Sequence, residues 1–176
     1  MNHQDHVNLL RRAVPRDSGP WADFGSGDGA FTLALRDLTG PDTEIFSIEK
    51  NTARLDQQQR NFAIKFPQSN IHFLHADFTR PLDLPPLAGL VIANTIHFFR
   101  DQEKMLCQLR GYLKKEGRLV LVEYNTDLGN PWVPYPLSFE AFRRLVVRAG
   151  FTEPELIATV PSGFLRQIYS ALTFSI

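Results

Sequence analysis

Three glycines at alternate positions, Gly25, Gly27 and Gly29, follow a short apolar run that begins at Trp21. A helix-like segment begins directly afterwards, at Ala30. Strand, glycine turn and helix in this order build the nucleotide pocket of an α/β sheet at its first crossover. Glycine lets a ligand approach the backbone closely and tolerates positive φ, while the helix N-terminus presents free N–H groups. The segment therefore predicts a binding site for a nucleotide-like ligand.

The charges around this turn favour one class of ligand over another. Gly25, Gly27 and Ala30 satisfy the dinucleotide fingerprint as well. A dinucleotide would place two phosphate charges at the helix N-terminus, where Asp23 and Asp28 would repel them. S-adenosylmethionine has no phosphate and carries a sulfonium and an ammonium, so an acidic turn suits it better. Asp28 could instead be only the N-cap of the helix, an interpretation that is compatible with ligand binding.

The segment from Trp21 to Gly29 resembles the first motif of the class I S-adenosylmethionine-dependent methyltransferases, apolar-apolar-Asp/Glu-apolar-Gly-x-Gly-x-Gly. The resemblance runs from about Gly19 to the C-terminus. It implies S-adenosylmethionine as cofactor and methyl transfer to a small-molecule acceptor by direct displacement. It also implies the fold: a Rossmann-like, doubly wound α/β sheet, mostly parallel, with an antiparallel C-terminal β-hairpin and strand order 3-2-1-4-5-7-6.

Periodicity and the positions of glycine and proline predict the elements that must hold these residues. Strands are expected at 21–24, 44–48, 71–74, 90–93, 118–124, 155–160 and 167–174. Helices are expected at 7–14, 29–38, 51–66, 101–115 and 138–149, with Gly117 ending the fourth. Only a short link separates the last two strands, so they can pair only as an antiparallel hairpin. A nicotinamide dehydrogenase would need a sixth parallel strand and a second domain instead.

Length and composition are those of one ordinary globular domain. The chain has 176 residues, 43% of them apolar and 22% charged. Basic and acidic residues number 19 each, and no basic tract suggests a nucleic-acid partner. One cysteine, Cys107, allows no intrachain disulfide, and no cysteine pair suggests a metal site. Without a signal peptide or a membrane-length apolar run, we expect a cytoplasmic protein.

A single domain, 1–176, is expected to divide into four parts. An N-terminal helix and loop (1–18) precede a cofactor-binding core (19–124), a candidate acceptor loop (125–137), and a helix with the terminal hairpin (138–176). Only about twenty residues precede the first strand, too few for a large helical cap. The acceptor site is therefore expected to be open, to be completed by a second subunit in a homodimer, or to take a large acceptor.

The ends of the next strands supply the remaining cofactor candidates. Glu49 follows the second strand, where a carboxylate can accept both ribose hydroxyls of either adenosine cofactor. By the resemblance, Asp77 accepts from the adenine amino group, Phe78 packs on the ring, and Asn94 lies beside the methionine part. The complete predicted cofactor set is Asp23, Phe24, Gly25, Ser26, Gly27, Gly29, Glu49, Lys50, Asp77, Phe78 and Asn94.

Candidates for catalysis and for acceptor binding leave the fourth and fifth strands. The imidazole of His97 could take a proton near neutral pH, or it could only shield the cofactor. The loop 125–137 contains three prolines and two aromatic residues, Trp132 and Tyr135. This composition indicates either a stiff wall of the acceptor pocket or a loop that covers the end of the sheet. The predicted acceptor-binding set is His97, Tyr124, Asn125, Trp132 and Tyr135. The alternatives to an enzyme are a non-catalytic methyltransferase-like binding domain and an NAD-binding module.

Overall fold

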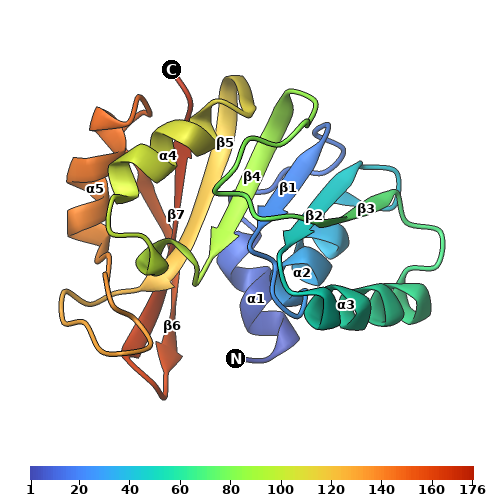
Figure 1. Ribbon diagram of the computed structural model, residues 1–176, viewed down its shortest axis with the longest axis horizontal. Coiled ribbons are helices and arrows are strands. Elements are labelled where there is room, and N and C mark those ends of the chain that lie inside the picture. The colour runs from blue at the N-terminus through green and yellow to red at the C-terminus, as the bar shows by residue number, and fades with distance from the viewer.

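The computed structural model describes residues 1–176 and contains one seven-stranded sheet between two layers of helices (Figure 1). The strand order is β3-β2-β1-β4-β5-β7-β6. Strands β1 to β5 are parallel to one another, and β7 pairs antiparallel with both β5 and β6. This arrangement confirms the predicted Rossmann-like sheet, its order and its terminal hairpin. No helix has the length and apolar character needed to cross a membrane.

The elements follow the sequence in an alternating pattern. The strands are β1 Trp21–Phe24, β2 Ile45–Glu49, β3 Ile71–His75, β4 Leu87–Ala93, β5 Leu113–Tyr124, β6 Glu155–Ser162 and β7 Arg166–Phe174. The helices are α1 His3–Leu10, α2 Ala30–Thr39, α3 Thr52–Lys65, α4 Gln102–Arg110 and α5 Phe139–Arg148, with a 3-10 turn, η1, at Ile96–Phe98.

The central strand β1 divides the core into two layers because alternate side chains point to opposite faces of a sheet. Trp21 packs with α1 and α2 on one face, where Leu10 and Leu35 are fully buried. Ala22 and Phe24 face the other side, where α4 and α5 contribute Leu106 and other buried residues. All four residues of β1 are buried, so the strand that leads into the glycine turn is fixed from both sides.

Several element boundaries differ from the sequence prediction, among them the end of the fourth helix and the start of the first. The fourth helix ends at Arg110, with Gly111 as its C-cap, and Gly117 lies inside β5. Leu113 instead begins β5 by pairing with Leu87 of β4. The first helix begins four residues earlier than predicted, because the side chains of Asn2 and Asp5 form a reciprocal capping box at its start.

Candidate functional site

A cavity of about 490 Å³ opens at the carboxyl edge of the sheet, where the glycine turn follows β1. This volume lies within the range of small-molecule and cofactor pockets. The carboxyl ends of the first four strands meet at this edge, and ligands of open α/β sheets bind there. Eight of the predicted cofactor residues line the cavity: Gly25, Ser26, Gly27, Glu49, Lys50, Asp77, Phe78 and Asn94.

Glu49, at the end of β2, is the buried carboxylate of the cavity wall, with 8% of its surface exposed. Its Oε2 accepts a hydrogen bond from the Gly27 N–H at 2.9 Å, and its Oε1 accepts from the Asn51 N–H at 2.7 Å. These two bonds fix the orientation of the carboxylate and leave further lone pairs free for a ligand. No ion pair joins Glu49 to Lys50 or Arg54, so the residue is not one half of a surface salt bridge.

A buried polar network holds the glycine turn from behind. Gln58 of α3 is fully buried and donates to the Gly27 carbonyl and to the Ser26 hydroxyl, both at 2.7 Å. Ser47 of β2 donates to the Gln58 side-chain oxygen at 2.7 Å. A Cβ at Gly29 would approach the Gln58 side chain to 2.7 Å, and φ there is +83°. Gly29 is therefore needed for packing against α3, and it does not line the cavity.

Asp23 and Phe24 also lie off the cavity wall, contrary to prediction. Phe24 is fully buried in the core, and Asp23 is 1% exposed with its Oδ2 accepting from the Thr32 hydroxyl at 2.6 Å. Burial raises the pKa of Asp23 to about 7, and the nearby Glu49 charge adds to the effect. Asp28 points to solvent beside Arg54, at 3.7 Å, and Gly29, not Asp28, is the N-cap of α2. The acids that face a ligand are thus Glu49 and Asp77.

Asp77 and Phe78 form the wall that follows β3. Asp77 is exposed and its Oδ1 accepts the Thr79 N–H at 3.0 Å. Hydrogen bonding from Thr79 lowers the pKa of Asp77, so this carboxyl stays ionised. The Phe78 ring is 7% exposed and lies edge-on to Phe24, with ring centroids 5.6 Å apart. A second ring, Phe99, lies 5.7 Å from Phe78 and also lines the cavity.

Asn94, directly after β4, has an unusual backbone and an unpaired side-chain oxygen. Its φ is +49°, a conformation that asparagine tolerates better than most residues. Its N–H donates to the Val122 carbonyl at 2.8 Å, which holds the residue at the end of the strand. Its Oδ1 is buried without a hydrogen-bond partner. A buried acceptor on a cavity wall fits a ligand that brings an N–H or O–H donor.

Helix α1 contributes a part of the wall that the sequence reasoning missed. Met1 and His6 line the cavity together with Phe31 of α2. The His6 and Phe31 rings meet edge-on with centroids 4.8 Å apart, and burial lowers the pKa of His6. No motif marks this contribution, since it arises from the packing of α1 against α2. The other lining residues not predicted are Ala30, Arg54, Thr79, Ala93, Thr95, Phe98 and Phe99.

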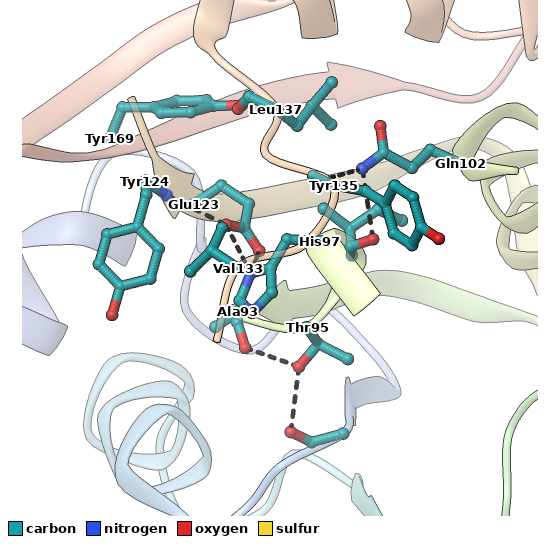
Figure 2. Close-up of polar contacts among 12 residues, drawn as sticks. Ala93, Thr95, His97, Gln102, Glu123, Tyr124, Val133, Tyr135, Leu137 and Tyr169 are labelled. Atoms are coloured by element: carbon teal, nitrogen blue, oxygen red, sulfur yellow. Dashed lines mark hydrogen bonds and ion pairs between the residues drawn. The ribbon is translucent and has the colours of Figure 1, made fainter. Parts of the chain in front are cut away.

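His97 does not line the cavity, which corrects the expectation that its ring faces the ligand. It is 3% exposed, and its Nδ1 lies 2.8 and 2.9 Å from the two carboxylate oxygens of Glu123, which is fully buried (Figure 2). The protein gives its Nε2 no hydrogen-bond partner. The Phe98 ring, which does line the cavity, packs against the His97 ring at 4.3 Å. His97 therefore reaches the cavity only through Phe98.

The other predicted acceptor residues, Tyr124, Asn125, Trp132 and Tyr135, do not line the cavity either. Both polar atoms of the Asn125 side chain are engaged, with Oδ1 accepting from the Phe139 N–H and Nδ2 donating to Gln167. Asn125 thus ties the loop to α5 and β7. Trp132 and Tyr135 are 69% and 41% exposed, and Tyr124 is partly buried.

Comparisons with known proteins agree with this architecture. A family model described as a methyltransferase domain matches residues 17–152. The YcgJ protein from Bacillus subtilis has a TM-score of 0.79 at 14% identity, with 98% of this chain and 99% of that one covered. An S-adenosylmethionine-dependent methyltransferase from Aquifex aeolicus has a TM-score of 0.76 at 17% identity, over 98% and 90% of the chains. Magnesium protoporphyrin IX methyltransferase from Synechocystis, with bound S-adenosylmethionine, has a TM-score of 0.74 at 12% identity, over 99% and 80%.

A search of curated protein sequences found no match. The identities to the solved structures are low, so those likenesses establish the fold. The family model spans the glycine turn, all the lining strand ends and α5, which is more than half of the chain. The chain therefore belongs to the methyltransferase domain family and has the fold of the class I S-adenosylmethionine-dependent methyltransferases.

Proposed function

We propose that the protein transfers a methyl group from S-adenosylmethionine to a small-molecule acceptor. The observation that carries the proposal is the polarity of the cavity wall. Glu49, Asp77 and Asn94 all present oxygen acceptors to the cavity. The ribose hydroxyls, the adenine amino group and the ammonium of S-adenosylmethionine are all donors, so the cofactor matches this wall in hydrogen-bonding character.

The glycine turn itself argues against a dinucleotide. The N–H groups of Gly25 and Ser26 both donate to the Ile48 carbonyl at 3.0 Å. The N–H of Gly27 donates to Glu49, and that of Gly29 donates to the Ser26 carbonyl at 2.9 Å. A pyrophosphate needs free N–H groups at this turn. Here these four are used within the protein, so they are not free to bind a pyrophosphate.

From the cavity residues we infer a place for each part of the cofactor. Glu49 would accept from the ribose hydroxyls, and Asp77 would accept from the adenine amino group while Phe78 packs on the adenine ring. The unpaired Asn94 oxygen would accept from the ammonium of the methionine part. The sulfonium then lies between the glycine turn and the Asn94 end of the cavity, close to Phe98 and α1.

The chemistry requires little of the protein beyond alignment. When bound, the cofactor supplies a methyl group on a positively charged sulfur, so the lone pair of the acceptor forms the new bond while the broken C–S pair returns to sulfur. The chain holds donor and acceptor in line and excludes water. His97 is the candidate proton acceptor: with its Nδ1 donating to Glu123, its Nε2 carries the free lone pair. Reaching an acceptor proton would require the Phe98 ring to move aside.

Titration calorimetry tests the proposal directly. We expect S-adenosylhomocysteine and S-adenosylmethionine to bind the purified protein and NAD to release no heat. A screen of metabolite pools for S-adenosylhomocysteine formation then separates an enzyme from a non-catalytic binding domain. Heat from NAD together with none from S-adenosylhomocysteine would reject the proposal, and cofactor binding without any product would leave a binding domain.

A further inference from the structure

Exposed aromatic side chains gather at one end of the sheet, beginning at the Phe98 wall of the cofactor cavity. Phe98, Trp132 and Phe164 are 58%, 69% and 51% exposed, although large apolar side chains are normally buried. They come from three segments far apart in sequence: η1, the loop after β5, and the tip of the β6–β7 hairpin. All three segments meet at the carboxyl edge of β4 and β5, because Tyr124 at the end of β5 pairs with Ile168 near the start of β7.

The rings form a row of neighbours that begins at the cavity and passes through the buried ring of His97. Phe98 lines the cavity and packs on His97 at 4.3 Å, and the Tyr124 ring follows 6.0 Å from His97. Phe164 lies 5.8 Å from Tyr124, and Trp132 lies 6.3 Å from Phe164. The row therefore leads from the cavity to the exposed rings of Phe164 and Trp132, and Figure 2 labels two of the residues along it, His97 and Tyr124.

The loop that carries Trp132 is held in place by hydrogen bonds and not by burial of the indole. The Asn130 side chain accepts from the N–H groups of Trp132 and Val133, both at 2.9 Å. Val133 is 1% exposed and anchors the loop against the core. The Tyr135 N–H donates to the His97 carbonyl at 3.0 Å, and Gln102 donates to the Tyr135 carbonyl at 2.7 Å (Figure 2). A fixed, exposed tryptophan loses little conformational entropy when it binds a partner.

We propose that this row, Phe98, Tyr124, Trp132 and Phe164, binds the methyl acceptor and that the acceptor carries a planar, mainly apolar ring system. Such a ring can lie against aromatic faces and edges, and the row offers these in sequence from the cavity outward. Because Phe98 belongs to both the row and the cavity wall, the row suits a small molecule that reaches the methyl group of the cofactor. A partner that covers only the outer surface would not use this connection. The proposal rests on the proposed function, since it assigns the acceptor side of the same site.

The chain offers a direct spectroscopic probe of this surface. It contains two tryptophans, and Trp21 is fully buried in the core while Trp132 is exposed on the row. The two indole N–H signals in a ¹⁵N–¹H spectrum therefore report on the core and on the row separately, and a Trp132→Phe variant assigns them. 2-Naphthol and its saturated analogue decahydro-2-naphthol, titrated in the presence of S-adenosylhomocysteine, differ in planarity and aromaticity but share the hydroxyl.

We expect 2-naphthol to shift the Trp132 signal and not the Trp21 signal, with a Kd about tenfold below that of decahydro-2-naphthol. Phe164→Leu, which keeps an apolar side chain but removes the ring, should raise the Kd of 2-naphthol about fivefold or more. Ile64→Ala, which removes an exposed apolar side chain from α3, is the matched control and should change nothing. S-adenosylhomocysteine affinity, measured by calorimetry, should be the same in all three proteins.

Three outcomes would overturn the inference while leaving the proposed function standing. Equal affinity for 2-naphthol and decahydro-2-naphthol would show that the acceptor need not be planar. An unchanged Kd for 2-naphthol in Phe164→Leu would show that the row does not bind it. Sedimentation that shows a wild-type dimer which Phe164→Leu dissociates would identify the occupant as a second copy of the chain. Failure of S-adenosylhomocysteine to bind the wild-type protein would instead reject the proposed function.

Discussion

The Glu49 side chain lines the cavity and also accepts a hydrogen bond from the glycine turn. Its two oxygens hold the Gly27 and Asn51 N–H groups, so the carboxylate is oriented before any ligand arrives. An oriented acceptor pays less entropy on binding than one on a mobile side chain. The same residue therefore supports both the shape of the turn and the affinity for a ligand with vicinal hydroxyls.

Replacement of Glu49 by glutamine should weaken S-adenosylhomocysteine binding by about 1–3 kcal/mol. The amide keeps one acceptor oxygen, but its NH₂ group would face either the Gly27 or the Asn51 N–H, which already donate to this side chain. Calorimetry measures the loss. Asp56→Asn, which removes an exposed acid from α3, is the control for net charge. Equal affinities in the two variants would show that Glu49 does not touch the cofactor.

Asp23 should make the stability of the protein depend on pH. Burial raises its pKa from 3.8 to about 7 in the folded state. Between about pH 4 and pH 7 the unfolded chain loses this proton while the folded protein keeps it, so the free energy of unfolding falls as pH rises through this window and levels off above it. The full effect is on the order of 4 kcal/mol.

The Asp23→Asn variant should lose this pH dependence. Urea unfolding at pH 4.5 and pH 8 measures it, and the variant should gain stability over the wild type only at the higher pH. The asparagine can still accept the Thr32 hydroxyl, so the native hydrogen bond is retained. Asp127→Asn, at an exposed position, should show the wild-type dependence. Parallel pH curves for wild type and Asp23→Asn would mean that Asp23 is ionised in the folded protein.

Helix α1 contributes to both stability and the cavity, because one of its faces packs in the core and another lines the cavity wall. Leu10, fully buried against α2 and the sheet, belongs to the core, whereas His6 lies on the cavity wall. His6→Ala should raise the Kd for S-adenosylhomocysteine about threefold or more and lower the free energy of unfolding by about 1 kcal/mol, the value of its ring contact with Phe31. Leu10→Ala should lower the free energy of unfolding by about 2–5 kcal/mol and leave the Kd unchanged in the folded protein.

Chemical denaturation and calorimetry on the two α1 variants separate the effects. A loss of affinity in Leu10→Ala equal to that in His6→Ala would mean that α1 affects binding only through general stability.

The elements could be predicted from the sequence where nearby residues determine their bounds. The prediction was less accurate where a bound depends on pairing between strands far apart in the sequence. The turn after β1 followed from its glycines, and the terminal hairpin followed from the short link between its strands. The boundary of α4 was wrong because Gly111 and Gly117 are both plausible ends, and only the pairing of Leu113 with Leu87 selects the first. That contact joins residues far apart in the sequence, so no local pattern reveals it.

The site shows the same division. Glu49 and Asp77 were found because a strand end at this edge must face the crevice. Asp23 was misplaced because it lies inside β1, so its side chain points to one face of the sheet and not to the carboxyl edge. There it accepts a hydrogen bond from Thr32 of α2. The His6 contribution required the docking of α1, which follows from tertiary packing alone.

At the scale of the whole molecule, ligand binding should stabilise the fold. A ligand that binds only the native state adds about 2.7 kcal/mol at a concentration of 100 times its Kd. For a domain of this size, about 2–4 °C per kcal/mol gives a rise in Tm of roughly 5–10 °C. A thermal scan with S-adenosylhomocysteine should show this shift, and NAD at the same concentration should show none. Equal shifts from both compounds would indicate binding to the adenosine part alone.

The position of β7 has a consequence for synthesis of the protein. This strand lies between β5 and β6, so the last strand made by the ribosome is an interior strand of the sheet (Figure 1). Until it emerges from the exit tunnel, β5 has an open edge and β6 has no partner in the sheet. Strands β1 to β5 can assemble on the nascent chain, but the aromatic row cannot form until the β6–β7 hairpin, which supplies Phe164, pairs with β5. The proposed acceptor side is thus the last part of the sheet edge to be completed, after the strands that carry the cofactor cavity are in place.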